Sequence, residues 1–227
     1  MKIATVSLDY YTMNNKAKCK TAANDVRKKK FDFAGFTEVR TDAMEEGLRE
    51  GIGANHTLKM GGESPQAFNH KRWKMTGFRI VDGNKGVADI TPNLKFTVVT
   101  YQNRKTPRKV IEVVSTHFVP LTQDGNPRPN YNKRWSMWQE MWGILKTIIA
   151  EAQQKNHTIF VIGDFNHIKA KKNIIKQLDS KAKWIVHAGL DWIFVVEGAT
   201  KVRRLQPTIN FGSGSDHKAH IRTVILA

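Results

Sequence analysis

The chain has 227 residues, 40% of them hydrophobic and 25% charged, so it can bury a core, and wholesale disorder is excluded. The single cysteine, Cys19, has no partner for an intrachain disulfide, which excludes a disulfide-stapled architecture. Lys and Arg outnumber Asp and Glu by 37 to 20, and the resulting net charge of +17 exceeds the roughly 2 to 8 that keeps a small domain soluble.

The first half of the chain predicts an α/β opening followed by strands. Alternating residues at 2–8 indicate a short strand, which precedes a basic helix over 16–30 and a buried strand over 31–39. A strand, a helix and a strand in this order are typical of α/β proteins. A helix over 41–49 follows, and turn-forming Gly, Asn and Pro then separate strands predicted over 67–73, 76–81, 94–101 and 110–118.

The longest predicted helix covers about 132–153. Its apolar residues recur at spacings of three and four and form one stripe: Trp135, Trp138, Trp142, Leu145 and Ile149. Tryptophans in a basic protein could stack on bases, but this period is typical of a helix that packs on a core. We therefore interpret the tryptophans as scaffold.

The remaining predicted elements are a strand over 158–162, a helix over 170–178, a strand over 190–196 and a closing strand over 220–226. No internal repeat, low-complexity tract or long linker divides the chain, so we expect one layered α/β domain over residues 1–227. The first residues reach Asp9 before a signal-peptide apolar region is complete, and the longest apolar runs are too short to cross a bilayer. We expect a soluble, cytoplasmic protein.

The positive charge is gathered in four clusters: Lys16, Lys18 and Lys20; Arg27, Lys28, Lys29 and Lys30; Arg104, Lys105, Arg108 and Lys109; Lys169, Lys171, Lys172 and Lys176. Each cluster alone is typical of a solvated face, but their sum favours a polyanionic partner that binds through its phosphates. Nucleic acid is the first candidate and an anionic membrane surface is the second.

Acidic, amide and imidazole side chains stand at the ends of the predicted strands: Glu38, His117, Asp164 and Asn166, Asp191, Asp216 and His217. Polar residues at the ends of neighbouring buried strands can converge on one rim, where the backbone holds them rigidly. Taken singly, each has a structural explanation as a surface carboxylate, a hydrogen-bonded histidine or a turn residue. Together they predict an active site.

These residues fall in a recognisable motif series. Glu38 after a buried strand, STH at 115–117, GDFN at 163–166, LDWIFV at 190–195 and SDH at 215–217 resemble the endonuclease/exonuclease/phosphatase superfamily. The match runs from the first strand to the last. The resemblance implies a four-layer α/β sandwich, in which two β-sheets pack face to face between helices and the site lies at one edge.

The resemblance also implies which residues bind metal and activate water. Glu38 would bind a divalent cation, normally Mg²⁺ with Mn²⁺ as a possible substitute, and Asp216 would complete the metal environment. Asp164 would orient or activate the attacking water. Asn166 would donate to the scissile phosphate or help to hold the metal.

Two histidines would assist the same reaction. His217, fixed by Asp191 in a carboxylate–imidazole pair, would contact the phosphate or transfer a proton. His117 would be the second imidazole and would donate a proton or a hydrogen bond. The DNase I branch supports this first histidine with a further acidic residue, for which Glu63 is the candidate.

One position departs from the family pattern. The family usually has Asn at the end of the first strand, whereas this chain has Ser7, a shorter and weaker ligand for the metal's second protein contact. Asp9 is the residue that could compensate. The replacement is the argument for a nucleic-acid-binding protein with a weakened nuclease core.

The sequence favours a Mg²⁺-dependent endonuclease that resembles DNase I and hydrolyses DNA. The STH motif is similar to the DNase I and sphingomyelinase branches, and the net charge of +17 favours nucleic acid over a neutral lipid. The alternative within the same fold is a phosphatase that acts on phosphoinositide or another phosphorylated small molecule. The weakened nucleic-acid-binding protein is the third hypothesis.

Overall fold

The structure is a computed structural model that describes residues 1–122, 129–167, 177–178, 181–212 and 218–226. Its helices are α1 (Tyr10–Met13), α2 (Lys16–Lys28), α3 (Asp42–Ile52) and α4 (Tyr131–Gln154). Its strands are β1 (Lys2–Ser7), β2 (Phe33–Thr37), β3 (His56–Lys59), β4 (Gln66–Asn69), β5 (Trp73–Asp82), β6 (Lys95–Asn103), β7 (Val110–His117), β8 (Thr158–Asp164), β9 (Ala182–Ala188), β10 (Asp191–Val196), β11 (Val202–Gly212) and β12 (Lys218–Leu226).

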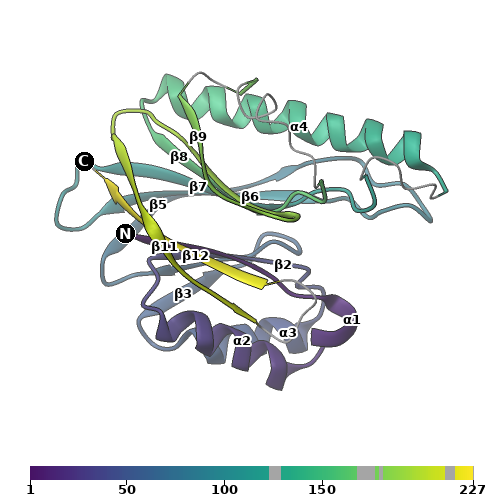
Figure 1. Cartoon of the computed structure of the whole chain (residues 1–227), viewed down its shortest axis with the longest axis horizontal. Coiled ribbons are helices and arrows are strands. Elements are labelled where there is room, and N and C mark those ends of the chain that lie inside the picture. Colours follow the sequence, from purple (N-terminus) through teal and green to yellow (C-terminus); the bar gives the residue numbers. More distant parts are fainter. Residues whose placement is uncertain (123–128, 168–176, 179–180, 213–217, 227) are drawn as a thin grey trace.

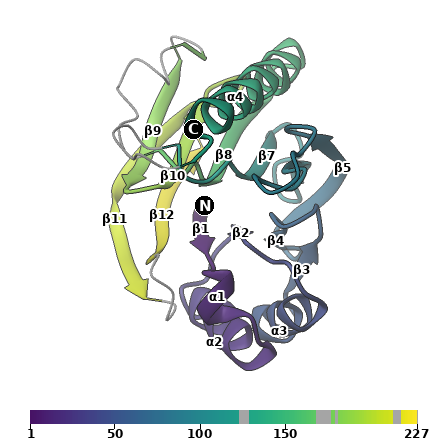
Figure 2. The same cartoon turned by 90° about the vertical axis from the view of Figure 1, so that its right-hand side faces the viewer.

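The strands form two six-stranded sheets, in the orders β11-β12-β1-β2-β4-β3 and β5-β6-β7-β8-β10-β9. The sheets pack face to face, with α2 and α3 on the outer face of the first sheet and α4 on the outer face of the second (Figures 1 and 2). The predicted four-layer α/β sandwich is confirmed.

Three buried apolar clusters fill the spaces between the four layers. Leu48 belongs to the cluster beneath α2 and α3, and Leu145 belongs to the cluster beneath α4. Between the sheets, Phe160 of β8 packs with side chains from both sheets, while its neighbour Val161 faces α4. Because β8 is covered on both faces, its sequence is a continuous apolar run rather than an alternating one.

Two parallel strand pairs determine where the site lies. β1 runs parallel to β2 and pairs Ser7 with Thr37, while β7 runs parallel to β8 and pairs His117 with Asp164. All four strands end at the same edge of the sandwich, which we name the site edge. In Figure 1 this edge lies towards α1, on the right, and both chain termini lie at the opposite end.

The tryptophan stripe has the scaffold role that its spacing predicts. On the inner face of α4, the side chains of Trp138, Trp142, Leu145 and Ile149 are buried in the apolar cluster beneath the helix. Trp135 is partly buried and packs against the same cluster. Within the described part of the chain, no helix combines the length and the apolar character needed to cross a membrane.

Several short or peripheral elements carry no clear signal in the sequence. β3, β9 and β11 were not predicted, and each pairs with a single neighbour in its sheet, where tertiary context outweighs residue pattern. α1 is a single turn that begins because the Asp9 carboxylate accepts a hydrogen bond from the Tyr11 amide at 3.0 Å.

Other predicted boundaries were wrong in detail. The strand expected over 67–73 is two strands, because β4 ends at Asn69 and Trp73 opens β5 in the other sheet. The helix expected over 170–178 lies almost wholly outside the described residues, which include only a turn at 177–178.

Candidate active site

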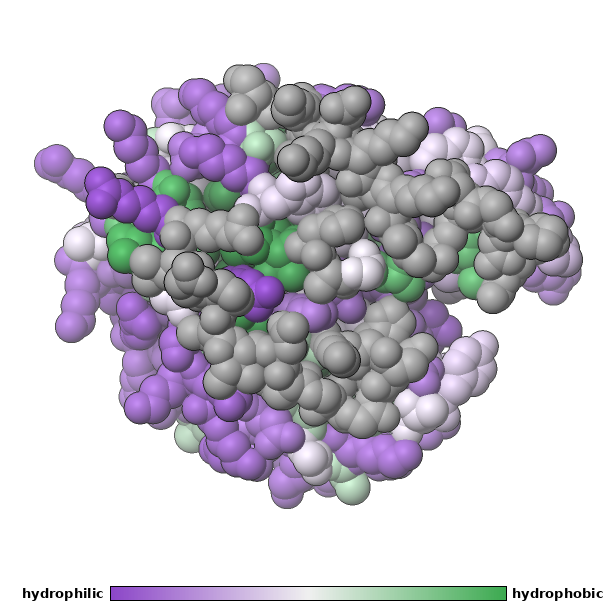
Figure 3. Space-filling model, viewed as in Figure 1, coloured by the Kyte–Doolittle hydropathy of each residue, from purple (hydrophilic) through white to green (hydrophobic). Residues whose placement is uncertain are grey.

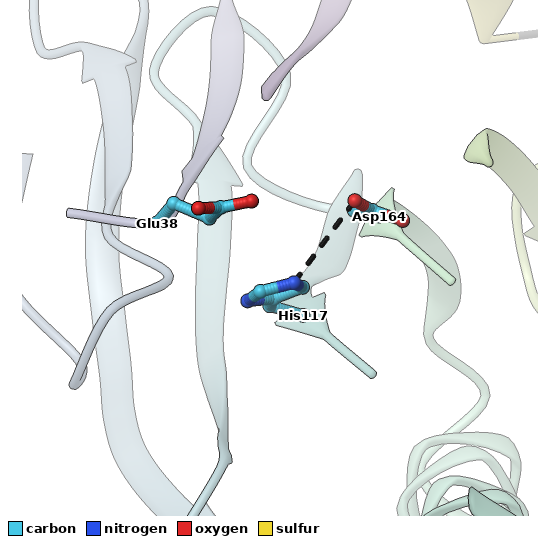
Figure 4. Close-up of side chains that lie close together, drawn as sticks. All are labelled: Glu38, His117 and Asp164. Atoms are coloured by element: carbon cyan, nitrogen blue, oxygen red, sulfur yellow. Dashed lines mark ion pairs between the residues drawn. The ribbon is translucent and has the colours of Figure 1, made fainter. Parts of the chain in front are cut away.

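Three predicted side chains converge at the site edge, as Figure 4 shows. Glu38 follows β2, His117 ends β7 and Asp164 ends β8. One ligand atom from each lies within 4.8 Å of those of the other two, and His117 Nε2 is 4.0 Å from Asp164 Oδ2. Residues from three separate parts of the chain therefore face a common point.

The backbone around these side chains is unusual. Glu38 has a φ of 64° and Asn166 a φ of 51°, both in the left-handed region, which costs Glu38 about 1–2 kcal/mol and which asparagine adopts more readily. Gly163 has a φ of 150°, and a Cβ there would lie 1.9 Å from the Thr116 carbonyl oxygen. A glycine is required at 163 because β7 and β8 approach each other closely just before Asp164. Such outliers gather at functional sites.

Phe165 anchors the turn that carries Asp164 and Asn166. Its ring is fully buried and stacks on Trp192 at 4.2 Å and on Phe118 at 4.7 Å between ring centroids. Its carbonyl accepts a hydrogen bond from Trp138 Nε1 at 2.8 Å. The core beneath α4 thereby fixes the direction of the two flanking polar side chains.

Asn166 and Asp164 are also joined directly. The Asn166 amide nitrogen donates to Asp164 Oδ1 at 2.7 Å, and Asn166 Nδ2 donates to the Phe118 carbonyl at 2.9 Å. Asp164 is only 1% exposed. Its carboxylate is therefore held in one orientation before any substrate arrives.

His117 and Glu63 form a buried ion pair. His117 Nδ1 lies 2.7 Å from Glu63 Oε1, and Arg40 Nε donates to Glu63 Oε2 at 2.7 Å. Burial acts to lower the pKa of His117, but the hydrogen bond and charge of Glu63, with Asp164 and Glu38, outweigh it and raise that pKa to about 9. Burial acts to raise the pKa of Glu63, but His117 and Arg40 outweigh it and lower that pKa to about 2. At neutral pH, His117 is an imidazolium.

Ser7 and Asp191 meet in the interior next to this group. The Ser7 hydroxyl donates to Asp191 Oδ1 and accepts a hydrogen bond from Thr37 Oγ1 at 2.9 Å. Both Ser7 and Asp191 are buried. A metal-binding role for Ser7 stays a prediction, and the structure shows a different partner for its hydroxyl.

The two predicted residues of the SDH motif, Asp216 and His217, lie outside the described residues. The Asp191–His217 pair therefore stays a prediction. Asp9, the residue expected to compensate for Ser7, caps α1 and accepts a hydrogen bond from Thr12 Oγ1 at 2.7 Å.

A pocket of about 380 Å³ opens over the site. It is lined by Glu38, His117, Asp164 and Asn166 together with Tyr11, Arg40 and Arg134. The last three were not singled out from the sequence, and the only signal was that Arg40 stands two residues after Glu38. Arg134 also donates from Nη1 to the Pro120 carbonyl at 3.4 Å, which ties α4 to the pocket wall.

The donors at this site fit a hard divalent cation. Glu38 and Asp164 present carboxylate oxygens, the ligand type that Mg²⁺ prefers. The Glu38 carboxylate is oriented by the Tyr10 amide at 3.2 Å and lies 4.0 Å from Arg40 Nη2. His117, as an imidazolium, is suited to donate a hydrogen bond rather than to bind a cation.

Several solved structures share this fold over nearly their whole length. An endonuclease/exonuclease/phosphatase from Bacteroides vulgatus aligns with a TM-score of 0.77 at 16% identity, covering 100% of this chain and 98% of that chain. TDP2 from D. rerio, complexed with single-strand DNA product, aligns with a TM-score of 0.73 at 10% identity and covers 99% and 98%. A Bacteroides thetaiotaomicron mannosyl-6-phosphatase aligns with a TM-score of 0.72 at 13% identity and covers 99% of both chains.

No known protein-family model matches the chain, and no curated protein sequence matches it. The structural alignments confirm the resemblance to the endonuclease/exonuclease/phosphatase superfamily as a shared fold. Activity and substrate have to be argued from the site itself.

Proposed function

We propose that the protein is a Mg²⁺-dependent phosphodiesterase that hydrolyses DNA as an endonuclease. The observation that supports this most is the meeting of two carboxylates, one imidazolium and one amide in a single pocket at the site edge. Hydrolysis of a phosphodiester needs an oriented water, stabilisation of the charge on phosphorus oxygens and a donor for the leaving oxygen. This set of groups can supply all three.

Each side chain has a role that suits its environment. Asp164, held by the backbone amide of Asn166, would orient and deprotonate the attacking water. His117 would donate from Nε2 to a phosphate oxygen or to the leaving oxygen, while Glu63 holds Nδ1. The side-chain amide of Asn166 would donate a hydrogen bond to the scissile phosphate or help to hold the metal.

Glu38 would hold Mg²⁺ together with Asp216, and Mn²⁺ could replace it. When bound, the cation would neutralise negative charge on the phosphate in the transition state. Asp191 and His217 would form the second carboxylate–imidazole pair. Ser7 would be a weak ligand of the metal at the end of β1, where its hydroxyl also contacts Asp191.

The rim of the pocket supports a nucleic-acid substrate. Tyr11 lines the pocket, and 82% of its surface is exposed. An exposed aromatic ring beside a phosphate site can stack on a base, which contributes about 1–3 kcal/mol per base. Arg40 and Arg134 line the same pocket and can pair with the flanking phosphates.

A phosphatase acting on a phosphorylated small molecule, with phosphoinositide as one class, is the second candidate. The similarity to a mannosyl-6-phosphatase favours it, and a pocket of about 380 Å³ lies in the size range of small-molecule sites. A soluble phosphate ester does not require the exposed ring of Tyr11 or a net charge of +17, so we rank this candidate second.

Nicking of supercoiled plasmid DNA tests the proposal. We expect cleavage with Mg²⁺ or Mn²⁺, none in excess EDTA, and strongly reduced cleavage by the Asp164→Asn variant. Cleavage that continues undiminished in excess chelator would overturn the assignment. Hydrolysis of phosphate monoesters without plasmid cleavage would favour the phosphatase, and DNA binding without either activity would indicate a weakened nuclease core.

A further inference from the structure

The edge opposite the site carries a concentration of positive charge. At this end β1, β2, β5 and β7 begin and β4 and β6 end, so the segments before, after and between them lie together. Lys2, residues 27–30, residues 71–72 and residues 104–109 supply eleven Lys and Arg side chains there, and we name this set the basic edge. Two of the four clusters found in the sequence belong to it.

Hydrogen bonds between the segments tie the basic edge into one surface. Lys2 Nζ donates to the Lys29 carbonyl at 3.0 Å, and Arg104 donates from its backbone nitrogen to the Arg72 carbonyl at 3.0 Å. Lys109 Nζ donates to the Leu226 carbonyl at 2.9 Å. Segments that are far apart in sequence therefore present their cations side by side.

Little negative charge offsets these cations. These segments contain no Asp or Glu, and two neighbouring carboxylates pair with their cations: Asp25 with Lys28 at 3.0 Å and Asp32 with Arg72 at 2.7 Å. Nine of the chain's seventeen net positive charges are thus concentrated at this edge. Figure 3 shows hydrophilic side chains over most of the lower left of the molecule, the side on which Figure 1 places the termini.

A pocket of about 450 Å³ lies within the basic edge, between the ends of α2, α3 and β4. Arg27, Lys30 and Arg72 line it with the amides of Asn55 and Asn69, and its lining residues, all in the described part of the chain, include no Asp or Glu. Three cations and two amides around one recess are groups that recognise a phosphate.

The position of Arg27 depends on the glycine beside it. Gly53 ends α3 with a φ of 73°, and a Cβ there would lie 2.6 Å from Arg27 Nη1. Arg27 Nη2 also donates to Asn24 Oδ1 at 2.5 Å, so the guanidinium is held against the pocket wall. A side chain fixed in this way loses less entropy when it binds an anion.

We propose that the basic edge is a second DNA-binding surface, on which a backbone phosphate occupies the pocket formed by Arg27, Lys30 and Arg72. The choice of DNA as the polyanion rests on the proposed function. β7 has eight residues and reaches from this edge to His117, so at about 3.3 Å per residue the two sites lie about 25 Å apart. The basic edge therefore contacts a part of the DNA remote from the scissile phosphate.

An anionic membrane fits this surface less well. Proteins that lie on membranes combine basic residues with apolar side chains that insert among the lipids. Among the large apolar side chains that are exposed in the described residues, Ile225 alone neighbours the basic edge, through Leu226. One isoleucine offers too little apolar area for an anchor.

Equilibrium binding of a fluorescent duplex oligonucleotide tests the proposal in the Asp164→Asn background with excess EDTA, so that cleavage does not interfere. The test variant is Arg27→Ala with Lys30→Ala, and the control is Lys146→Ala, which removes an exposed lysine in the middle of α4. Affinity is measured from low to physiological salt, and binding to phosphatidylcholine vesicles containing phosphatidylserine is measured alongside.

We expect the test variant to weaken DNA binding and to lower the slope of log Kd against log salt by about 1 for each lost phosphate contact, while the control changes little. Equal effects of test and control variants, or no effect of either, would overturn the proposal. Unchanged DNA binding with lost vesicle binding would overturn it in favour of a membrane. Because binding is measured without turnover, absence of nuclease activity in the wild type would leave this result interpretable and would count against the proposed function alone.

Discussion

The two ends of the central strands differ in burial and in coupling. At the site edge, Glu63, His117 and Asp164 are largely buried, and His117 lies 2.7 Å from Glu63 and 4.0 Å from Asp164. At the basic edge, Arg27 and Lys30 are exposed, and positive charge accumulates with little compensation. The same strands therefore present a rigid, pre-oriented group at one end and a solvated, cationic surface at the other.

This difference predicts how each end responds to substitution. Groups in one buried network depend on each other, so their losses are large and do not add. Exposed cations interact weakly with each other through water, so their losses are small and nearly additive. Substitutions at the site edge should therefore have the larger effects.

Asp164→Asn removes the carboxylate that would orient and deprotonate water. We expect DNA cleavage to fall by about 10²- to 10⁴-fold, the usual contribution of general acid–base catalysis, while the thermal midpoint is retained. Asp82→Asn is the control, because the Asp82 side chain is 70% exposed and its nearest cation, Lys95, is 3.8 Å away. Activity that merely follows the folded fraction in both variants would refute a chemical role for Asp164.

Glu63→Gln tests the ion pair behind the imidazole. The raised pKa of His117 stabilises the fold fully below about pH 6.5, and this stabilisation, about 3 kcal/mol at most, is lost as the pH rises through about 9. The lowered pKa of Glu63 gives stability that is present above about pH 4.5 and is lost as the pH falls through about 2.

We therefore expect the wild type to lose more stability than Glu63→Gln between about pH 6 and 9.5, measured by urea unfolding in chelator. Arg72→Gln at the basic edge is the comparison, because Arg72 does not contact His117. Parallel pH profiles for the wild type and Glu63→Gln would show that the pair is not coupled.

Ser7→Ala tests whether the end of β1 is part of the buried network. The change removes the acceptor of the Thr37 hydroxyl and one donor to Asp191, so we expect a loss of about 1–3 kcal/mol in the free energy of unfolding. Thr5→Val is a matched control on the same strand, because the buried Thr5 hydroxyl has no hydrogen-bond partner among the described residues. Equal destabilisation by both changes would contradict the network.

Tyr11→Ala should have the smallest effect of the site-edge variants. Its ring is exposed, so the fold should be unaffected, and we expect loss of about 1 kcal/mol of DNA affinity from one missing stacked base. Phe78→Ala, another exposed aromatic residue, is the control. If both substitutions leave the affinity for single-stranded DNA unchanged, the stacking role of Tyr11 is wrong.

The sequence was most informative where a buried strand ends in a polar residue. The positions of Glu38, His117, Asp164 and Asn166 at strand ends were enough to predict that they meet, because parallel strands bring their carboxyl ends to one edge. Glu63 could be named only as a candidate, since no local pattern connects it to His117. Their contact depends on how the segment before β4 packs against β7.

Other features could not be predicted because they depend on tertiary packing. Tyr11, Arg40 and Arg134 come from a one-turn helix, a loop and a long helix, and only the packed layers bring them to one pocket. Likewise, the clusters at 27–30 and 104–109 gave no sign in sequence that they share an edge remote from the site. β3, β9 and β11 were missed because peripheral strands carry little apolar alternation.

Steady-state cleavage of one DNA substrate by two variants tests most directly whether the site edge carries the chemistry and the basic edge binds DNA. We predict that Asp164→Asn lowers kcat with little change in KM, whereas Arg27→Ala with Lys30→Ala raises KM and retains kcat. If the basic-edge variant lowered kcat as Asp164→Asn does, or if neither variant changed either constant, chemistry at one edge and DNA binding at the other would be contradicted.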